Sequence, residues 1–509
     1  MGLSILEFYN TKIKKIWKIA FFSAFVATLF IHIYKFTNTL PNHDSLYSFY
    51  SSLDATATGR WFLKFPGYIS SCFDLPWING VLSAIYLGVT AVFISIVFKM
   101  TNPVAVVLSS ILLVASPCTT ETFFYEFTAD AYFFGLMLAT IGSYLFIIGN
   151  KQTNKQHLVF GMICICLSCA IYQAYVSFSI LLFLCYLLVQ IINKNISVKE
   201  GWLQIGKQSL LYLVSIIAYY IIWKVLLFIT NNAATSYLGI DSVEKISLSN
   251  LIHGVVASAV NLLRWFFGGN KLGQVVTLYS ISHYVLLVAF IVVLIFALKK
   301  NNIFQCPGRL VLVFICTLSC VPFISLWNYV SPNLLYRPMM MHSVIVLFIL
   351  TITLIDKWFT PKISTIFGFF VIVIIFNYSI IANIAYIEMD QTVQQSNATA
   401  TRIMQIVNSY DNINQIAFVG SRQDSLYVGN KSYGVKGYPL ATWIEEDLLY
   451  DHIHTYLYLT QYMDLDIPSV SNNELKIIQN NPNVAELPAW PNSNCSTVVD
   501  NILVIKLGN

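Results

Sequence analysis

Long apolar runs separated by short basic connectors make up the first 387 residues of the chain. A helix that crosses a hydrocarbon core of roughly 30 Å needs about 20 mainly apolar residues. The runs that reach or approach this length cover residues 16–36, 77–98, 103–117, 131–149, 158–173, 176–192, 208–230, 280–298, 309–328, 338–355 and 363–387. The pattern predicts an α-helical polytopic membrane protein with about eleven spans.

The charged residues between the runs predict the orientation of the chain. Lys and Arg in short loops mark the cytoplasmic side of a membrane. With the N-terminus in the cytoplasm, most connector lysines and arginines lie inside, and an odd number of spans places the C-terminus outside. We therefore expect a membrane domain over residues 1–387, with outer loops 37–76, 118–130 and 231–279, and an extracytoplasmic C-terminal domain over residues 388–509.

Composition separates these two domains and excludes several classes of protein. Only 10% of the 509 residues are charged, 57% are hydrophobic, and the mean hydropathy is +0.68. Soluble domains are about one quarter charged, so an ordinary cytosolic enzyme and a nucleic-acid-binding protein are excluded. Residues 388–509 carry 13 acidic and six basic residues, as a soluble domain would. A helix-like pattern at 399–410 and strand-like patterns at 413–420 and 501–506 predict a small α/β domain.

The outer loop 231–279 contains a further amphipathic segment. Apolar residues recur at helical spacing over residues 248–267, and Gly268-Gly269 ends the pattern as a helix C-cap would. We expect this helix to lie in the membrane interface with its apolar face toward the lipid.

The first outer loop holds Asp44 a few residues beyond the first run, followed by Asp54 and by Gly59-Arg60-Trp61. A carboxylate at the membrane–water boundary can reach both a lipid-borne group and an aqueous partner. Removing the proton of a sugar hydroxyl requires such a base, held in place and partly dehydrated. The alternative is that Asp44 caps a helix beginning at Ser45, because Asp is a favoured N-cap.

The second outer loop brings three carboxylates, Glu121, Glu126 and Asp130, into ten residues at membrane depth. Carboxylates at this depth cost free energy unless they are solvated, so those that are present often have a function. The functional interpretation is a second acidic wall of a cleft for an acceptor sugar. The alternative is a solvated loop in which Asp130 caps the next helix.

Four outer cations are candidates for binding a phosphate: Arg60, Arg264, Lys271 and Arg337. Arg337 follows Tyr336 where the tenth run begins, and an arginine there can offer two parallel hydrogen bonds to a lipid phosphate. The alternative is a side chain that extends to the headgroups only as an anchor.

Neither a cofactor nor a metal is expected. The spacing of Cys166 and Cys169 suits a metal pair, but no second ligand pair follows at the distance typical of zinc sites. Cysteines within apolar runs are more often small hydrophobic residues. No GxGxxG, Walker A or HExxH motif is present.

The order of these features resembles the integral-membrane GT-C glycosyltransferases. Within that class it is most similar to the phage-type serotype-converting glucosyltransferases that modify O-antigen. The matching residues are His43-Asp44-Ser45 followed by Gly59-Arg60-Trp61, and the multi-span organisation covers most of the chain.

The resemblance implies transfer of a glucosyl unit from a polyprenyl-phosphate sugar, such as undecaprenyl phosphate glucose, to an O-antigen sugar of lipopolysaccharide. The reaction would take place among membrane lipids on the periplasmic face of a bacterial inner membrane, with inversion at the anomeric carbon. An acid of the first outer loop serves as base in this class, which implies Asp44. Many relatives carry a second acid beside the first. Here His43 and Ser45 flank Asp44, so assistance by Asp54, Glu121 or Asp130 is open.

These considerations define the expected site. The catalytic candidates are Asp44, Glu121 and Asp130. The candidates for binding substrate are His43, Asp54, Arg60, Trp61, Glu126, Arg264, Tyr336 and Arg337.

Two other functions compete with this interpretation. A transporter or flippase for lipid-linked polysaccharide would place polar residues at mid-membrane, often in repeated halves. The runs contain few ionisable groups apart from Lys224, and no repeat is visible. An O-antigen polymerase or ligase would use related chemistry on a different acceptor, and residue types do not distinguish it.

Overall fold

The computed structural model of the chain describes residues 11–48, 54–235, 248–267, 278–329, 337–422 and 448–508, and it divides into two compact units. The helical unit consists of Met1–Asn38, Ser52–Asn383 and Gly437–Ala441. The terminal unit consists of Thr39–Ser51, Ile384–Lys436 and Thr442–Asn509. The division falls inside one helix, α17 (Pro361–Val407), and residues 39–51 of the expected first outer loop belong to the terminal unit.

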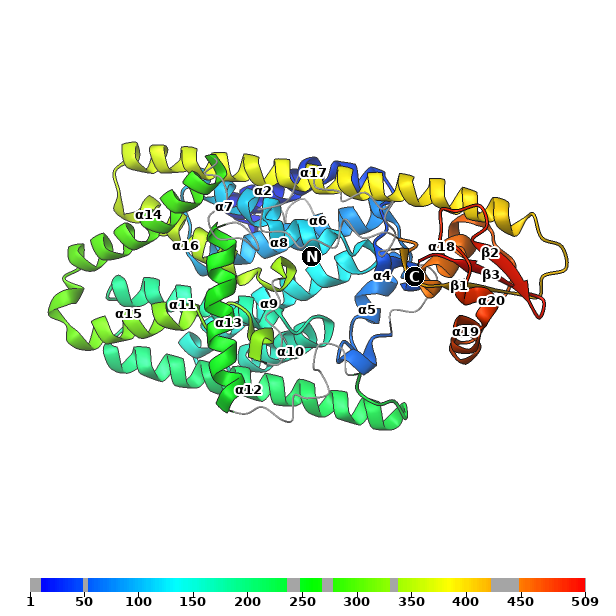
Figure 1. The fold of residues 1–509 in the computed structure, drawn as a ribbon. Helices are drawn as coiled ribbons and strands as arrows, with labels where there is room; N and C mark the ends of the chain where they lie inside the picture. The colour runs from blue at the N-terminus through cyan, green and yellow to red at the C-terminus, as the bar shows by residue number, and fades with distance from the viewer. Residues whose placement is uncertain are drawn as a thin grey trace. The chain divides into compact units, whose positions relative to one another are not determined.

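The helical unit is built mainly from long apolar helices (Figure 1). In chain order the α-helices of this unit, long and short, are α2 (Lys15–Ile31), α3 (Ile33–Thr37), α6 (Pro76–Val97), α7 (Pro103–Ala115), α8 (Pro117–Phe123), α9 (Glu126–Gln152), α10 (Lys155–Ile171), α11 (Tyr175–Ile192), α12 (Val198–Ile229), α13 (Leu248–Phe267), α14 (Leu278–Lys300), α15 (Pro307–Cys320), α16 (Ser343–Trp358) and the first part of α17. Shorter helical turns are η1 (Thr56–Thr58), α5 (Lys64–Gly67), η2 (Tyr68–Ser70), η4 (Ile303–Gln305), η5 (Leu326–Tyr329) and η6 (Pro338–Met340).

The helix lengths support the predicted helical membrane protein. Within the described ranges, six helices are long and apolar enough to cross a membrane: α6, α9, α11, α12, α14 and α17. The pair α7 and α8, bent by 42°, would make a seventh. Helices α10 and α15 are apolar but have only 17 and 14 residues, and the first predicted run is broken at His32 between α2 and α3. The number of eleven spans therefore remains an expectation.

Local sequence signals account for several helix starts. Asn102 accepts a hydrogen bond from the Val104 backbone at the start of α7. Ser116 and Asn154 cap α8 and α10 in the same way. Ser197 and Glu200 form a reciprocal capping box at α12. Each cap satisfies backbone N–H groups that the first helical turn leaves unpaired.

Glycines set the close packing of α9 against α10. A Cβ added to Gly142 would lie 2.8 Å from the Ile165 side chain and 3.1 Å from the Gly161 carbonyl oxygen. On α10, a Cβ at Gly161 would lie 2.6 Å from the Phe146 ring. Small residues let helix backbones approach closely where hydrophobic burial alone does not hold helices together, as in a bilayer. The register of α9 on α10 therefore depends on these positions.

Helix α13 lies across the direction of the longer helices (Figure 1). Its buried face includes Ser258 and Asn261, and Ser258 accepts a hydrogen bond of 2.9 Å from Asn328 of η5. Ile252 and Val256 are among the exposed residues of its opposite face. The predicted amphipathic helix is confirmed, and its place at a membrane surface remains an expectation.

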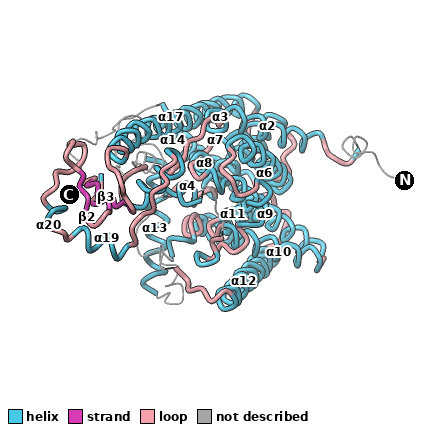
Figure 2. Tube along the Cα trace, turned by 90° about the vertical axis from the view of Figure 1, so that its right-hand side faces the viewer, coloured by secondary structure: helices cyan, strands magenta, loops and turns pink. Residues whose placement is uncertain are grey.

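The terminal unit contains a three-stranded sheet, drawn in magenta in Figure 2, in which the strand order is β1-β3-β2. Strand β1 (Gln415–Val419) pairs in parallel with β3 (Ile502–Lys506), and β2 (Ser496–Val499) pairs antiparallel with β3. The predicted strands at 413–420 and 501–506 are confirmed as β1 and β3. The predicted helix at 399–410 is the end of α17, which continues to Val407.

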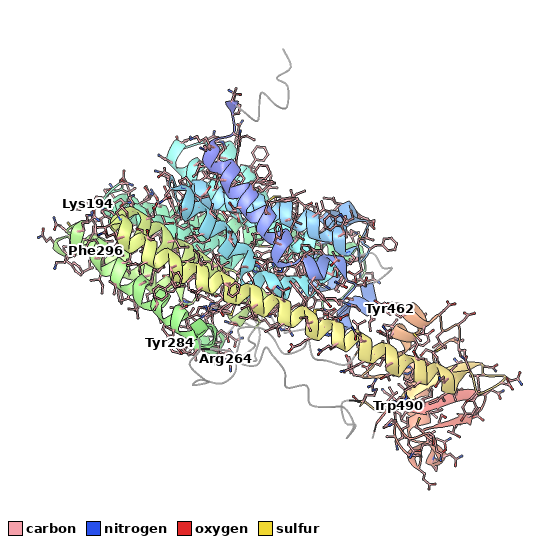
Figure 3. The ribbon with its side chains drawn as sticks, turned by 90° about the horizontal axis from the view of Figure 1, so that it is seen from above. Lys194, Arg264, Tyr284, Phe296, Tyr462 and Trp490 are labelled. Atoms are coloured by element: carbon pink, nitrogen blue, oxygen red, sulfur yellow. The ribbon has the colours of Figure 1, made fainter. Side chains whose placement is uncertain are left out.

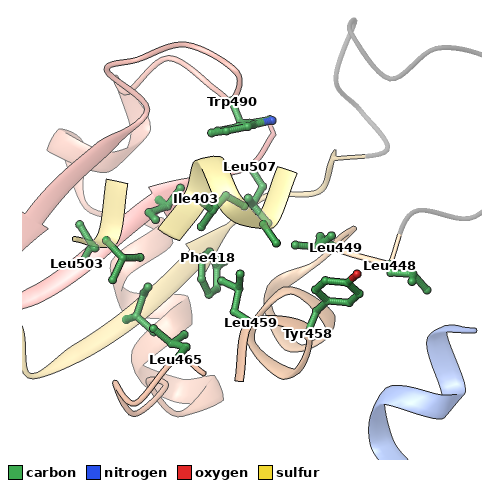
Figure 4. Close-up of a cluster of buried hydrophobic side chains, with 14 of the residues drawn as sticks. Ile403, Phe418, Leu448, Leu449, Tyr458, Leu459, Leu465, Trp490, Leu503 and Leu507 are labelled. Carbon is green, nitrogen blue, oxygen red and sulfur yellow. The ribbon is translucent and has the colours of Figure 1, made fainter. Parts of the chain in front are cut away.

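Further helices complete the terminal unit: α4 (His43–Ser48), α18 (His452–Met463), α19 (Asn472–Gln479) and α20 (Pro482–Ala485). Its core is a cluster of buried side chains that includes Ile403, Phe418, Tyr458 and Leu503 (Figure 4). Leu46 of α4 belongs to the same cluster. An early segment of the chain thus contributes to the hydrophobic core of the C-terminal unit.

We expect Gly142→Leu to lower the free energy of unfolding by about 1–3 kcal/mol, because the new side chain must displace Ile165 and the α10 backbone. Denaturant unfolding in detergent micelles measures the change. Gly206→Leu is the matched control, because a Cβ at Gly206 meets nothing within 4 Å. A loss of the same size in both variants would contradict the packing argument.

Candidate functional site

Two side chains of α12 donate hydrogen bonds to backbone carbonyls of the loop that carries Arg60 and so fix this loop to the helix. Tyr219 donates its hydroxyl to the Gly59 carbonyl at 3.0 Å, and Trp223 donates its indole N–H to the Thr56 carbonyl at 2.7 Å. Gly59 has φ +79°, and a Cβ there would overlap the Tyr219 hydroxyl. Glycine is therefore required on both conformational and steric grounds.

Asp54 has a structural role at the start of this loop. Its Oδ1 accepts hydrogen bonds from the Thr56 hydroxyl at 2.6 Å and from the Thr56 backbone N–H at 3.1 Å. These bonds lower the pKa of Asp54 below its ordinary value. The carboxylate therefore stabilises the turn through η1. Its expected role in binding substrate remains a prediction.

Arg60 lies at the centre of a group of aromatic and charged side chains, here called the arginine cluster. Its guanidinium donates to the Tyr132 hydroxyl at 3.0 Å and lies 5.3 Å from the centre of the Tyr172 ring, which stacks on Tyr132 at 4.8 Å. Arg337 and Glu121 are also close enough to interact electrostatically with the Tyr172 hydroxyl. The structure thus brings together three of the expected site residues, Arg60, Glu121 and Arg337, from distant parts of the sequence.

The carboxylates of the second outer loop are buried. Glu121 lies in α8, Glu126 opens α9, and Asp130 lies one turn further along α9. The alternative of a solvated loop is therefore wrong. Asp130 is inside the helix, so it is not a cap, because α9 begins before it.

Glu126 forms an ion pair with Lys35, a residue that the sequence analysis did not single out. Lys35 Nζ lies 2.6 Å from Glu126 Oε2, and only 1% of the Lys35 side chain is exposed. Asp74 lies close enough to interact electrostatically with both charges. Burial raises the pKa of Asp74 to about 6, although Lys35 opposes the shift. The only sequence signal for Lys35 was a cation near the end of an apolar run.

Asp44 lies in the first turn of α4, in the terminal unit. The helix begins at His43, and Asn42 Oδ1 accepts from the Ser45 backbone N–H at 2.9 Å. Asn42 is therefore the cap, and the alternative in which Asp44 caps the helix is wrong. The Asp44 side chain is 43% exposed, and its Oδ1 lies 3.5 Å from His43 Nε2.

The remaining expected residues lie elsewhere. Trp61 packs in a hydrophobic cluster with Trp223 and contacts Phe62. Arg264 lies in the last turn of α13, along the side of the helical unit that also carries Tyr284 (Figure 3). Tyr336, like Lys271, lies outside the described residues. The contacts of the described residues thus place neither Trp61 nor Arg264 in the arginine cluster.

No group of three or more His, Cys, Asp or Glu side chains in the described part of the chain could hold a metal ion. Cys166 and Cys169 are both buried in α10 among apolar side chains.

The helical unit thus combines several apolar helices of membrane-spanning length with buried charged side chains. Residues 33–348, more than half of the chain, match the family profile of the glucosyl transferase GtrII. The chain therefore belongs to the GtrII glucosyltransferase family, and the expected resemblance is confirmed. Comparisons with curated proteins and with solved structures find no significant match.

We expect Lys35→Met to destabilise the fold by about 3–5 kcal/mol, because it leaves the buried Glu126 carboxylate without its cation. The double variant Lys35→Met, Glu126→Gln should recover much of the loss. Unfolding in detergent measures both, with Lys207→Met, at an exposed lysine of α12, as control. Equal stability of the single and double variants would contradict the coupling.

Proposed function

We propose that this glucosyltransferase moves a glucosyl unit from polyprenyl phosphate glucose to an O-antigen sugar. The reaction takes place on the periplasmic face of a bacterial inner membrane, with the N-terminus in the cytoplasm and the terminal unit in the periplasm. The acceptor hydroxyl oxygen bonds to the anomeric carbon as the bond from that carbon to the phosphate oxygen breaks. The bond's electron pair stays with the leaving polyprenyl phosphate. The configuration at the anomeric carbon inverts.

The observation that carries the proposal is the arginine cluster. A polyprenyl phosphate is already a good leaving group, so the enzyme must mainly orient the acceptor, remove one proton and stabilise negative charge. Arg60 and Arg337 supply two cations beside the same tyrosine, within the region that matches the family. We assign the phosphate of the donor to these two guanidinium groups, with Arg264 and Tyr336 as further contacts.

Asp44 is the proposed base that accepts the proton of the acceptor hydroxyl. Its half-exposed carboxylate is accessible to an aqueous sugar, and it lies within the residues matched to the family. Glu121 and Asp130 are proposed to assist at the acceptor. His43, Asp54, Trp61 and Glu126 are proposed to help bind substrate.

Mass spectrometry of the O-antigen repeat tests the function. A host that makes a compatible lipid-linked glucose and O-antigen should add one hexose when it expresses the wild-type chain. Asp44→Asn should add none at a matched membrane level, because an amide cannot accept the proton. Asp466→Asn, at an exposed carboxylate of the terminal unit, is the control and should add hexose normally. Full transfer by Asp44→Asn would remove Asp44 as base, and no transfer by the wild-type chain would contradict the function.

A second measurement addresses the phosphate. Arg60→Gln should lower kcat/KM for the lipid-linked donor by about a hundredfold, because it removes a cation that stabilises the leaving phosphate. Arg60→Lys should recover only part of the loss, since an ammonium lacks the planar fork of the guanidinium. Lys207→Gln is a charge-matched control on an exposed face. An unchanged kcat/KM in Arg60→Gln would assign the phosphate elsewhere.

A further inference from the structure

A carboxylate–imidazole pair occupies the start of α18 in the terminal unit. Asp451 Oδ1 accepts from the His454 backbone N–H at 2.8 Å and therefore caps the helix. The same oxygen lies 2.7 Å from His454 Nδ1. One carboxylate thus begins the helix and also orients an imidazole ring three residues later.

Tyr450 holds the other side of the His454 ring. The Tyr450 hydroxyl lies 3.3 Å from His454 Nε2, and the two rings stack at 4.3 Å. With Nδ1 donating to Asp451, Nε2 is left as the acceptor for the tyrosine hydroxyl. The His454 side chain is only 6% exposed. Its ring is thus held by contacts on both nitrogens and on one face.

This ring is a neighbour of the proposed base. Helix α4 packs against α18 within the terminal unit. The His43 and His454 ring centres are 6.2 Å apart, and His43 Nε2 faces Asp44 Oδ1 at 3.5 Å. The order of contact therefore runs from Asp451 through His454 and His43 to Asp44.

We infer that Asp451 and His454 are positioning residues for the proposed base Asp44 and that they act on it through His43. The inference rests on the proposed function. Asp44 is half-exposed on a helix of six residues, so its orientation depends on neighbours. A buried, hydrogen-bonded imidazole beside His43 limits where His43 can lie, and His43 in turn limits the carboxylate. Bases gain rate from being held in place before the reaction.

The charge state of Asp451 is consistent with this role. Burial favours the neutral acid, but the hydrogen bonds from His454 hold the pKa of Asp451 below its ordinary value. The carboxylate is therefore ionised at neutral pH and remains a strong acceptor for the imidazole N–H. The family match ends at residue 348, so it includes His43 and Asp44 but neither Asp451 nor His454.

The first test is Asp451→Asn in the full-length protein, assayed with polyprenyl phosphate glucose and purified O-antigen. Asparagine caps helices as well as aspartate does, so the start of α18 is preserved. The substitution removes only the negative charge that Asp451 places beside His454. We expect kcat to fall about tenfold, with the KM of donor and acceptor unchanged, because only the placement of the base is affected. His454→Gln should give the same division between kcat and KM.

Ser471→Ala is the matched control. Ser471 caps α19 in the same unit, and its removal weakens the fold without touching the histidines. It should leave kcat unchanged. A fall in kcat in this control equal to that in Asp451→Asn would show that general loss of stability is enough, and would overturn the inference.

A double variant separates positioning from an independent structural role. If Asp451 acts through His43, adding Asp451→Asn to His43→Gln should cause no further loss of kcat. Losses that multiply, or a normal kcat in Asp451→Asn, would overturn the inference while leaving the proposed function standing. Absence of transfer by the wild-type protein would instead overturn both.

Discussion

The ion pair between Lys35 and Glu126 is the constraint on which much of the helical unit depends. Two charges buried among apolar helices are tolerated only when they neutralise each other at short range. Their 2.6 Å contact ties α3 to the first residue of α9. Helix α9 is in turn held against α10 by Gly142 and its neighbours. Tyr132, less than two turns beyond Glu126, then receives the hydrogen bond from Arg60. Because Glu126 and Tyr132 lie on the same helix, α9, the ion pair helps to fix the position of Tyr132 in the arginine cluster.

The opposite side of the arginine cluster is held by a different device. Arg60 follows a left-handed glycine whose carbonyl is bound by Tyr219, and the turn before it is closed by Asp54. The guanidinium is therefore presented by backbone that cannot easily move. A cation held in this way requires little reorganisation when negative charge develops, and this is the main route by which enzymes stabilise such charge. This rigid support on both sides is what the proposed role of Arg60 at the donor phosphate requires.

The sequence predicts the parts of this architecture that depend on local pattern. Apolar runs of sufficient length identify most of the helices, and the strand-like patterns at 413–420 and 501–506 identify β1 and β3. The burial of Glu121 and Glu126 was not predictable, because the partner of Glu126 lies 91 residues earlier and a carboxylate-rich loop suggests solvent. The sequence does not distinguish Asn42 from Asp44 as the N-cap of α4, because both residue types are suitable and only hydrogen-bond geometry identifies Asn42. The pair Asp451 and His454 carries no motif that links it to Asp44.

Residues 39–51 make the terminal unit discontinuous in sequence. Leu46 is buried with Phe418 and Tyr458, so this unit completes its core with a segment that precedes it by more than 300 residues. Folding of the unit must therefore wait for a contact of very long sequence separation, which is entropically costly to close. The same segment carries the proposed base. If only residues 388–509 were exchanged between relatives, the core of the new C-terminal domain would have to pack against the α4 of the recipient protein. The placement of Asp44 would then change as well, so an exchange that preserves the core must include residues 39–51.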